Sequence, residues 1–337
     1  MRRISATLRD GTAVETITIG KEGGLQAKIL TLGATLSDLV VPVAGGGRRS
    51  VILGFDGPQG HRDTPGFLGV VAGRCANRIA GGRFELDGQT HRLDLNEKGA
   101  THLHGGSDGF WNRIWTVLEA DDDFVLLALT SPDGDQGYPG AVQVTCRYTA
   151  SATRLTIALE ACTDRPTLVN LATHAYFNLD GEGDILGHRL TIPAESYTPV
   201  DDALIPTGEI ATVEDTRFDF RKPRSIGQGD ASHHEGYDHN FVLAMQPAER
   251  PHRVARLEGG KGDTAMEIWS TEPGLQFYDG AGLPLPHPLR GGRESVRFGG
   301  LCLEPQRFPD AINHADFAGA VLRPGEVYSQ VTEYRFD

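Results

Sequence analysis

A histidine, a tyrosine and an asparagine alternate along residues 170–179 of the chain. In an extended chain, His174, Tyr176 and Asn178 would share one face. Imidazole, phenol and amide groups on one face are unusual for a protein core and typical of a pocket that binds a polar ligand. Because histidine titrates near neutral pH, His174 is a candidate proton donor and acceptor, although a buried structural histidine would give the same pattern.

A carboxylate stands at the end of an apolar run near the C-terminus. Glu304 lies in the sequence GLCLEPQ, residues 300–306. Burial raises the pKa of a carboxyl group unless a cation or hydrogen bonds offset it, and a raised pKa makes glutamate an effective general base. A structural ion pair with an arginine is the alternative. Asp238, in the segment GYDHNF, could approach Glu304, so a pair of glycosidase carboxylates also fits.

The segment GRCANRI, residues 73–79, offers hydrogen-bond donors for hydroxyl oxygens. It holds Asn77 together with the guanidinium groups of Arg74 and Arg78. A surface strand with structural ion pairs would have the same composition.

Two histidines in THLHGG, residues 101–106, raise the question of a metal. His102 and His104 would lie on the same side of an extended chain, and some β-barrel metalloenzymes hold iron or manganese in this way. Such sites also need a carboxylate a few residues later, but the nearest downstream glutamate is Glu119. We therefore expect no metal site here.

The elements that position these groups are predicted to be strands. Apolar and polar residues alternate over 142–148 and 155–161, which predicts two paired strands. Residues 84–86 and 90–93 flank the turn pair Asp87-Gly88, which is typical of a hairpin. Many short strands, no linker and no internal repeat favour one domain over residues 1–337, an all-β fold built as a large antiparallel β-sandwich.

Charge and composition limit the partners. The net charge of -13 argues against nucleic acid, and no apolar run is long enough to span a membrane. Residues 4–18 lack the uninterrupted apolar stretch of a signal peptide, and the four cysteines form no C-x-x-C pair. We expect a cytoplasmic monomer or homodimer that binds a small neutral molecule, with no nucleic-acid or membrane partner.

Six segments, in this order, resemble the aldose 1-epimerase (galactose mutarotase) family: GRCANRIAGGRFELDG, HLHGG, THAYFNL, GYDHNF, PGLQFY and LEPQ. The similarity runs from Thr31 to the LRPGE segment that ends at Glu326. It implies a galactose mutarotase-like β-sandwich, in agreement with the strand pattern. It also implies an isomerase that interconverts the α and β anomers of a free hexose, galactose or glucose, by opening and closing the ring without a cofactor.

The resemblance also implies roles for individual residues. Glu304 would be the base and His174 the acid. Sugar hydroxyls would be held by Asn77, Arg78, His104, Asp238 and Gln276, and Tyr176 would line the same pocket. One departure is Ala100-Thr101, where the family often has an asparagine before HLHGG; the loop over residues 97–99 looks lengthened. This bears on substrate preference and not on the reaction.

Other functions fit part of the pattern. A mutarotase of a hexose phosphate would need extra basic residues around the pocket. A carbohydrate-binding or sensing protein would need neither a proton donor nor an acceptor, so the presence of both His174 and Glu304 favours the enzyme. A glycoside hydrolase or lyase is a third alternative. Galactose, glucose, xylose and arabinose all stay open as substrates, because specificity at one hydroxyl depends on loop geometry.

Overall fold

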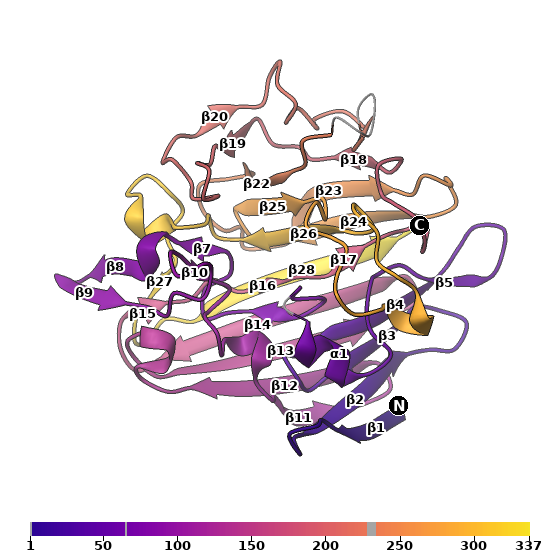
Figure 1. Cartoon of the computed structure of the whole chain (residues 1–337), viewed down its shortest axis with the longest axis horizontal. Helices are drawn as coiled ribbons and strands as arrows, with labels where there is room; N and C mark the ends of the chain where they lie inside the picture. The colour runs from indigo at the N-terminus through magenta and orange to yellow at the C-terminus, as the bar shows by residue number, and fades with distance from the viewer. Residues whose placement is uncertain (1, 65, 228–233) are drawn as a thin grey trace.

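Strands dominate the computed structural model, which describes residues 2–64, 66–227 and 234–337 (Figure 1). The largest sheet has nine strands joined by antiparallel pairing. In spatial order they are β11 (Thr116–Ala120), β12 (Phe124–Ser131), β13 (Val142–Ala150), β14 (Arg154–Thr163), β28 (Tyr328–Phe336), β24 (Ala265–Ser270), β23 (His252–Glu258), β18 (Arg189–Thr191) and β21 (Arg224–Ser225). Because β28 pairs with both β14 and β24, the C-terminal strand lies inside this sheet.

A second sheet of six strands carries many of the polar residues noted in the sequence. Its spatial order is β17 (Tyr176–Phe177), β26 (Leu301–Gln306), β25 (Gly274–Tyr278), β22 (Asp238–Val242), β19 (Ser196–Thr198) and β20 (Ala211–Thr212). The N-terminal strands form a third sheet in chain order: β1 (Arg2–Thr7), β2 (Ala13–Gly20), β3 (Gln26–Leu30), β4 (Leu36–Pro42) and β5 (Arg48–Ser50).

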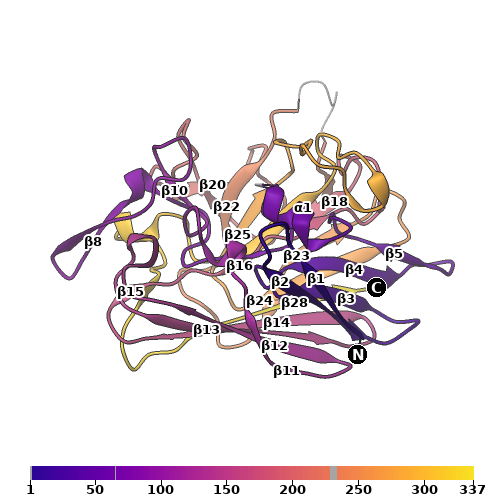
Figure 2. The same ribbon diagram turned by 60° about the horizontal axis from the view of Figure 1, so that its bottom comes forward.

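Short ladders, one short α-helix and several single-turn 3-10 helices complete the described elements. The ladders are β6 (Val71–Ala72) with β16 (Ala172–Thr173), β7 (Arg78–Ile79) with β10 (His102–Leu103), β8 (Arg83–Leu86) with β9 (Gln89–Arg92), and β15 (Thr167–Leu168) with β27 (Val321–Leu322). The helix is α1 (Pro58–Asp63). Figure 2 shows strands β11 to β13 as a lower layer, with β8, β10 and α1 on the other side of the molecule. None of the described helices combines the length and apolar character needed to span a bilayer.

A hydrophobic core draws side chains from all three large sheets. Strand β13 shows the underlying alternation, because Val142, Val144, Cys146 and Tyr148 are buried while the residues between them are more exposed. The predicted pair of strands is confirmed as β13 and β14, and the predicted hairpin as β8 and β9. The expectation of a large antiparallel β-sandwich is also confirmed.

Residues 170–179 do not form the continuous strand that the alternation suggests. Strand β16 pairs with β6 and strand β17 pairs with β26, so His174 lies in the break between them. Its main-chain N–H donates to Val70 at 2.9 Å, and its carbonyl accepts from Gly69 at 2.8 Å. These bonds join the main chain of His174 to residues 69–70 and not to β26.

Candidate active site

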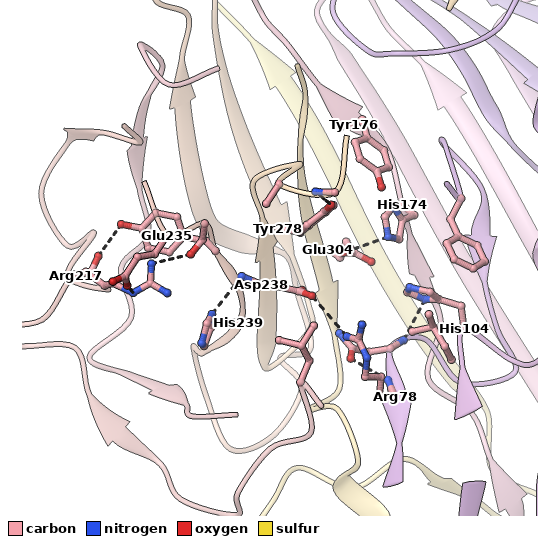
Figure 3. Close-up of a pocket in the computed structure, with 18 residues that line it drawn as sticks. Arg78, His104, His174, Tyr176, Arg217, Glu235, Asp238, His239, Tyr278 and Glu304 are labelled. Atoms are coloured by element: carbon pink, nitrogen blue, oxygen red, sulfur yellow. Dashed lines mark hydrogen bonds and ion pairs between the residues drawn. The ribbon is translucent and has the colours of Figure 1, made fainter. Parts of the chain in front are cut away.

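A cavity of about 600 Å³ opens beside the six-stranded sheet, a volume typical of small-molecule sites (Figure 3). Strands β17, β22, β25 and β26 contribute side chains to its wall. The ladder of β7 and β10, which comes from the first third of the chain, contributes the facing side chains.

Strand β26 presents Glu304 to this cavity. All six of its residues are buried, and Leu301 and Leu303 belong to the hydrophobic core. Strand alternation therefore turns Cys302 and Glu304 to the opposite face. Because β17 pairs with β26 at Leu301 and Cys302 and not further along the strand, that side of β26 is open beside Glu304.

The break between β16 and β17 places His174 at this open position. Its Nε2 lies 3.8 Å from Oε1 of Glu304, and its Nδ1 lies 3.4 Å from Sγ of Cys302. Figure 3 shows the imidazole and the carboxylate facing each other. Oε2 of Glu304 is buried without a hydrogen-bond partner among the described residues, so a hydroxyl of a ligand would satisfy it.

Burial moves the pKa values of this pair in opposite directions. It raises the pKa of Glu304 well above the ordinary value, and nearby Asp238 adds to the shift while Arg78 opposes it. It lowers the pKa of His174 to about 4, although a hydrogen bond to the residue's own carbonyl offsets part of the shift. The pKa of Glu304 therefore lies above that of His174, so a single proton held by the empty pair resides on Glu304. Transfer of that proton to His174 creates a carboxylate base beside an imidazolium acid.

A left-handed turn brings His104 next to His174, with 5.0 Å between the ring centroids. Gly105 continues the turn at φ 88, where a Cβ would lie 1.7 Å from the carbonyl oxygen of Gly73, so only glycine fits. Nδ1 of His104 accepts the main-chain N–H of Asn77 at 3.2 Å, which assigns the ring proton to Nε2. Burial and the neighbouring His174 keep the pKa of His104 well below its ordinary value, so the ring is a neutral donor.

Two carboxylates hold Arg78 at the cavity wall. Glu97 accepts hydrogen bonds from Nε and Nη2 at 2.8 Å each, while Nη1 lies 3.6 Å from Oδ2 of Asp238. The other oxygen of Asp238 accepts a hydrogen bond from the amide of Gln276 at 2.6 Å. Burial disfavours the charge on Arg78, but the two ion pairs outweigh it and raise the pKa of the guanidinium.

The structure gathers seven of the eight predicted site residues at the cavity. They are Asn77, Arg78, His104, His174, Tyr176, Asp238 and Glu304. Gln276 does not line the cavity and instead supports Asp238 from behind. Asn178, expected on the face of His174 and Tyr176, turns away and donates its amide to nearby loop carbonyls, those of Glu182, Gly183 and Gly299.

The prediction that His102 and His104 share one side is wrong. The ring of His102 lies between the carbonyl of Asp94 and the hydroxyl of Tyr138, at 2.7 Å from each. Strand β10 ends at Leu103 and the chain then turns left-handed, so the alternation does not extend across the two histidines. His102 is a structural residue.

Arg74, the other guanidinium of the GRCANRI segment, also points away from the cavity. It is buried, and it donates to the carbonyls of Pro139 and Gly140 at 2.9 Å each and to the hydroxyl of Ser131 at 2.6 Å. The alternative interpretation of this segment, a surface strand with structural ion pairs, does not describe Arg74, which is buried and donates to neutral groups. Arg78 does form ion pairs, with Glu97 and Asp238, but at the wall of the cavity.

Metal-ligating side-chain types gather at one place among the described residues. Ligand atoms of His174, Cys302 and Glu304 lie within 4.8 Å of one another. Burial raises the pKa of the Cys302 thiol well above its usual range, so the sulfur keeps its proton and is a poor metal ligand. The chemistry of this donor set fits proton transfer better than metal binding.

Three functional features were missed by sequence reasoning. Glu97, noted only as part of a lengthened loop, is the anchor of Arg78. Phe67 packs against His104 and His174 with ring centroids 4.6 and 6.0 Å away, and no sequence signal marks it. Asn96 lies six residues before the start of HLHGG and makes two hydrogen bonds to the main chain of residue 103. An asparagine therefore holds this loop, but from a different position than the sequence pattern suggested.

Comparison with known proteins shows similarity along almost the whole chain. Residues 15–335 match the family model described as aldose 1-epimerase. Galactose mutarotase of Rattus norvegicus is 39% identical over 97% of this chain and 95% of its own length. Aldose 1-epimerase of Escherichia coli (strain K12) is 37% identical over 97% of this chain and 96% of its own length.

Solved structures give the same result. A GalM/aldose epimerase homologue from C. elegans superposes with a TM-score of 0.89 at 31% identity, covering 96% of this chain and 98% of its own. Galactose 1-epimerase from Lactobacillus acidophilus superposes with a TM-score of 0.84 at 28% identity, covering 100% of this chain and 98% of its own.

Proposed function

The chain belongs to the aldose 1-epimerase family and is an isomerase that interconverts the anomers of a hexose, and we propose that Glu304 and His174 move the protons. The observation that carries this proposal is the 3.8 Å approach of Glu304 Oε1 to His174 Nε2 at the cavity, with their pKa values shifted in opposite directions. Neighbouring titratable groups whose pKa values are shifted in opposite directions are typical of an acid and a base that work together.

Ring opening uses both groups at once. Ionised Glu304 takes the proton of the anomeric hydroxyl while protonated His174 donates its Nε2 proton to the ring oxygen. The bond between the anomeric carbon and the ring oxygen breaks, and its electron pair stays on that oxygen. The oxygen of the former anomeric hydroxyl becomes the aldehyde oxygen, so the protein has gained one proton and lost one.

Ring closure reverses the two roles on the other face of the aldehyde. Rotation about the bond between the first two carbons exposes that face. The hydroxyl formed from the ring oxygen attacks this face and returns its proton to His174, while Glu304 gives its proton to the aldehyde oxygen, which becomes the new anomeric hydroxyl. No electron is gained or lost overall.

The surrounding polar groups hold the open chain while it rotates. Arg78 and Asp238 would bind adjacent sugar hydroxyls, because their mutual distance of 3.6 Å leaves hydrogen-bonding capacity on both. His104 would donate its Nε2 proton to another hydroxyl. Asn77 and Tyr176 line the same cavity, and Gln276 fixes the carboxylate of Asp238. Held in this way, the aldehyde stays close to the two proton-transfer groups.

The charges at the cavity favour an unphosphorylated hexose, and we propose galactose and glucose as substrates. Arg78 is paired with Glu97 and Asp238, and Arg217, which lies away from His174 in Figure 3, is 3.7 Å from Glu235. Each of these cavity arginines thus has a carboxylate neighbour, which weakens its attraction for a phosphate. We also propose a cytoplasmic monomer or homodimer, and the four free thiols suit a reducing compartment.

Polarimetry of freshly dissolved α-D-galactose and α-D-glucose tests this proposal. The protein is added in the presence of a chelator, with spontaneous mutarotation as the blank. We expect faster approach to anomeric equilibrium with wild-type protein and almost no acceleration with Glu304→Gln. An unaltered rate with Glu304→Gln would exclude Glu304 as the base.

A further inference from the structure

Cys302 contacts the nitrogen of His174 that the proton transfer described above does not use. Its Sγ lies 3.4 Å from Nδ1, and both side chains are buried. Cys302 and Glu304 are two residues apart on one face of β26, so a single strand contacts both ring nitrogens. We propose that Cys302 is a positioning residue that holds the imidazole with Nε2 turned toward Glu304 and the sugar.

A thiol can both donate and accept a hydrogen bond, so it can stay bonded to Nδ1 of His174 while the protonation of the ring changes during turnover. When His174 is neutral, the S–H group donates to Nδ1 and the ring proton sits on Nε2, where the sugar needs it. When the ring is doubly protonated, Nδ1–H becomes the donor and the sulfur accepts. A carboxylate at this position could only accept and would favour the charged ring, while an apolar side chain could do neither.

The thiol favours the productive tautomer of the neutral ring. A group at Nδ1 that could only accept a hydrogen bond would hold the ring proton there and leave a bare Nε2 toward the sugar. The sulfur of Cys302 lies 3.4 Å from Nδ1, and its S–H group can donate to that nitrogen, which places the ring proton on Nε2. Burial raises the pKa of the Cys302 thiol, so the sulfur keeps the proton it donates.

Other groups around the ring pack on its faces. Phe67, His104 and Tyr176 lie with ring centroids 6.0, 5.0 and 5.2 Å away. Within the described residues, the further titratable groups that influence this cluster come from other strands, and they are Arg78 of β7, Asp238 of β22, Tyr278 of β25 and Tyr334 of β28. Cys302 is the described side chain with a hydrogen bond to Nδ1.

The test compares two substitutions that both remove the sulfur, and it rests on the proposed role of His174 as the acid. Cys302→Ser keeps a γ group that donates and accepts, whereas Cys302→Ala removes it. We expect Cys302→Ser to keep kcat within about twofold of wild type and Cys302→Ala to lower kcat about tenfold, the effect of one hydrogen bond, with KM unchanged. If the smaller residues destabilise the fold, the larger pair Cys302→Thr and Cys302→Val makes the same comparison.

Two further readouts separate positioning from packing. In a His174→Gln background, Cys302→Ser and Cys302→Ala should have equal rates, because the thiol acts only through the imidazole. Nitrogen-15 NMR of histidine-labelled protein at neutral pH should show the His174 proton on Nε2 in wild type and Cys302→Ser, and a shift toward Nδ1 in Cys302→Ala.

The possible results test the role of Cys302 separately from the proposed role of His174 as the acid. Equal rates and equal tautomers for the serine and alanine variants, with His174→Gln inactive, would overturn the role of Cys302 and leave His174 as the acid. Wild-type turnover by His174→Gln would overturn the role of His174 itself.

Discussion

Glu97 holds Arg78 through both carboxylate oxygens, each 2.8 Å from a guanidinium nitrogen, while Asp238 lies 3.6 Å from the third nitrogen. The hydroxyl of Thr101 donates to Glu97 at 2.7 Å and fixes the carboxylate in turn. The loop before HLHGG thereby helps to position a guanidinium that we propose binds sugar.

The substitution Glu97→Gln should weaken substrate binding more than it slows the chemistry. Without the bidentate partner, Arg78 is free to close on Asp238, and both groups then lose capacity for sugar hydroxyls. We expect KM for galactose to rise about tenfold, the effect of about 1.4 kcal/mol of lost interaction, with kcat within about twofold. Initial rates by polarimetry measure both constants, and Glu85→Gln, on the exposed hairpin, is the matched control. An unchanged KM would show that Arg78 keeps its position without Glu97.

The substitution Glu304→Gln should abolish turnover without unfolding the protein. The amide keeps the shape of the side chain but cannot take the anomeric proton, so kcat should fall by about 10²-fold or more. Glu272→Gln is the control, because Glu272 is also fully buried but pairs with Arg307 and does not line the cavity. Equal losses in both variants would point to a general effect of changing a buried glutamate.

The pH dependence of kcat/KM should report the proton shared by Glu304 and His174. On the acid side activity should fall as pH approaches 4, where neutral His174 takes up a proton while Glu304 is still protonated and no carboxylate base can form. On the alkaline side it should fall where the pair loses its one proton, above the ordinary range of a glutamate. The two apparent pKa values of this profile belong to the Glu304–His174 pair and not to either residue alone. Rates over about pH 3.5 to 9, corrected for spontaneous mutarotation, measure the profile. An acid limb centred above about pH 6, near the ordinary histidine value, would contradict this assignment.

Strand alternation predicted the site well wherever a strand persists. Glu304 follows Leu301 and Leu303 of the core in strict alternation, so its face could be inferred from the apolar run. The same rule gave the wrong side for His102, because β10 ends before the left-handed turn at His104. That turn depends on the close approach of Gly105 to Gly73, a contact between distant segments that spacing cannot reveal.

The other site residues that the sequence did not predict depend on contacts between segments far apart in the chain. The pairing of Glu97 with Arg78 and the packing of Phe67 on His104 depend on how loops meet over the sheet. Arg74 and Arg78 are four residues apart and chemically identical, yet one lies in the core and the other at the cavity. The prediction of one domain over residues 1–337 stays a prediction.

Glu272 should make stability depend on pH in a way that its amide variant does not. Burial raises the pKa of Glu272 from 4.5 to about 7, although Arg307 opposes the shift. Between these values the folded state binds more protons than the unfolded state, so the free energy of unfolding falls as pH rises, by at most about 1.4 kcal/mol per pH unit. Urea unfolding at about pH 5 and about pH 7.5 should show a smaller loss for Glu272→Gln than for wild type. Parallel losses in the two proteins would mean that Glu272 is ionised in the folded state throughout.

Replacing the buried guanidinium of Arg74 should cost stability and spare the chemistry. Nη1 donates to two main-chain carbonyls at 2.9 Å and Nη2 donates to the hydroxyl of Ser131 at 2.6 Å, and a lysine keeps the charge but cannot reach all of these acceptors. Buried acceptors left without donors destabilise the folded state, so Arg74→Lys should lower the free energy of unfolding by about 3 kcal/mol. Arg83→Lys, at an exposed arginine, should change it by less than about 0.5 kcal/mol. Urea unfolding measures both variants, and kcat of folded Arg74→Lys should stay close to wild type, because Arg74 does not line the cavity. A large fall in kcat with unchanged stability would instead place Arg74 among the groups that act on the sugar.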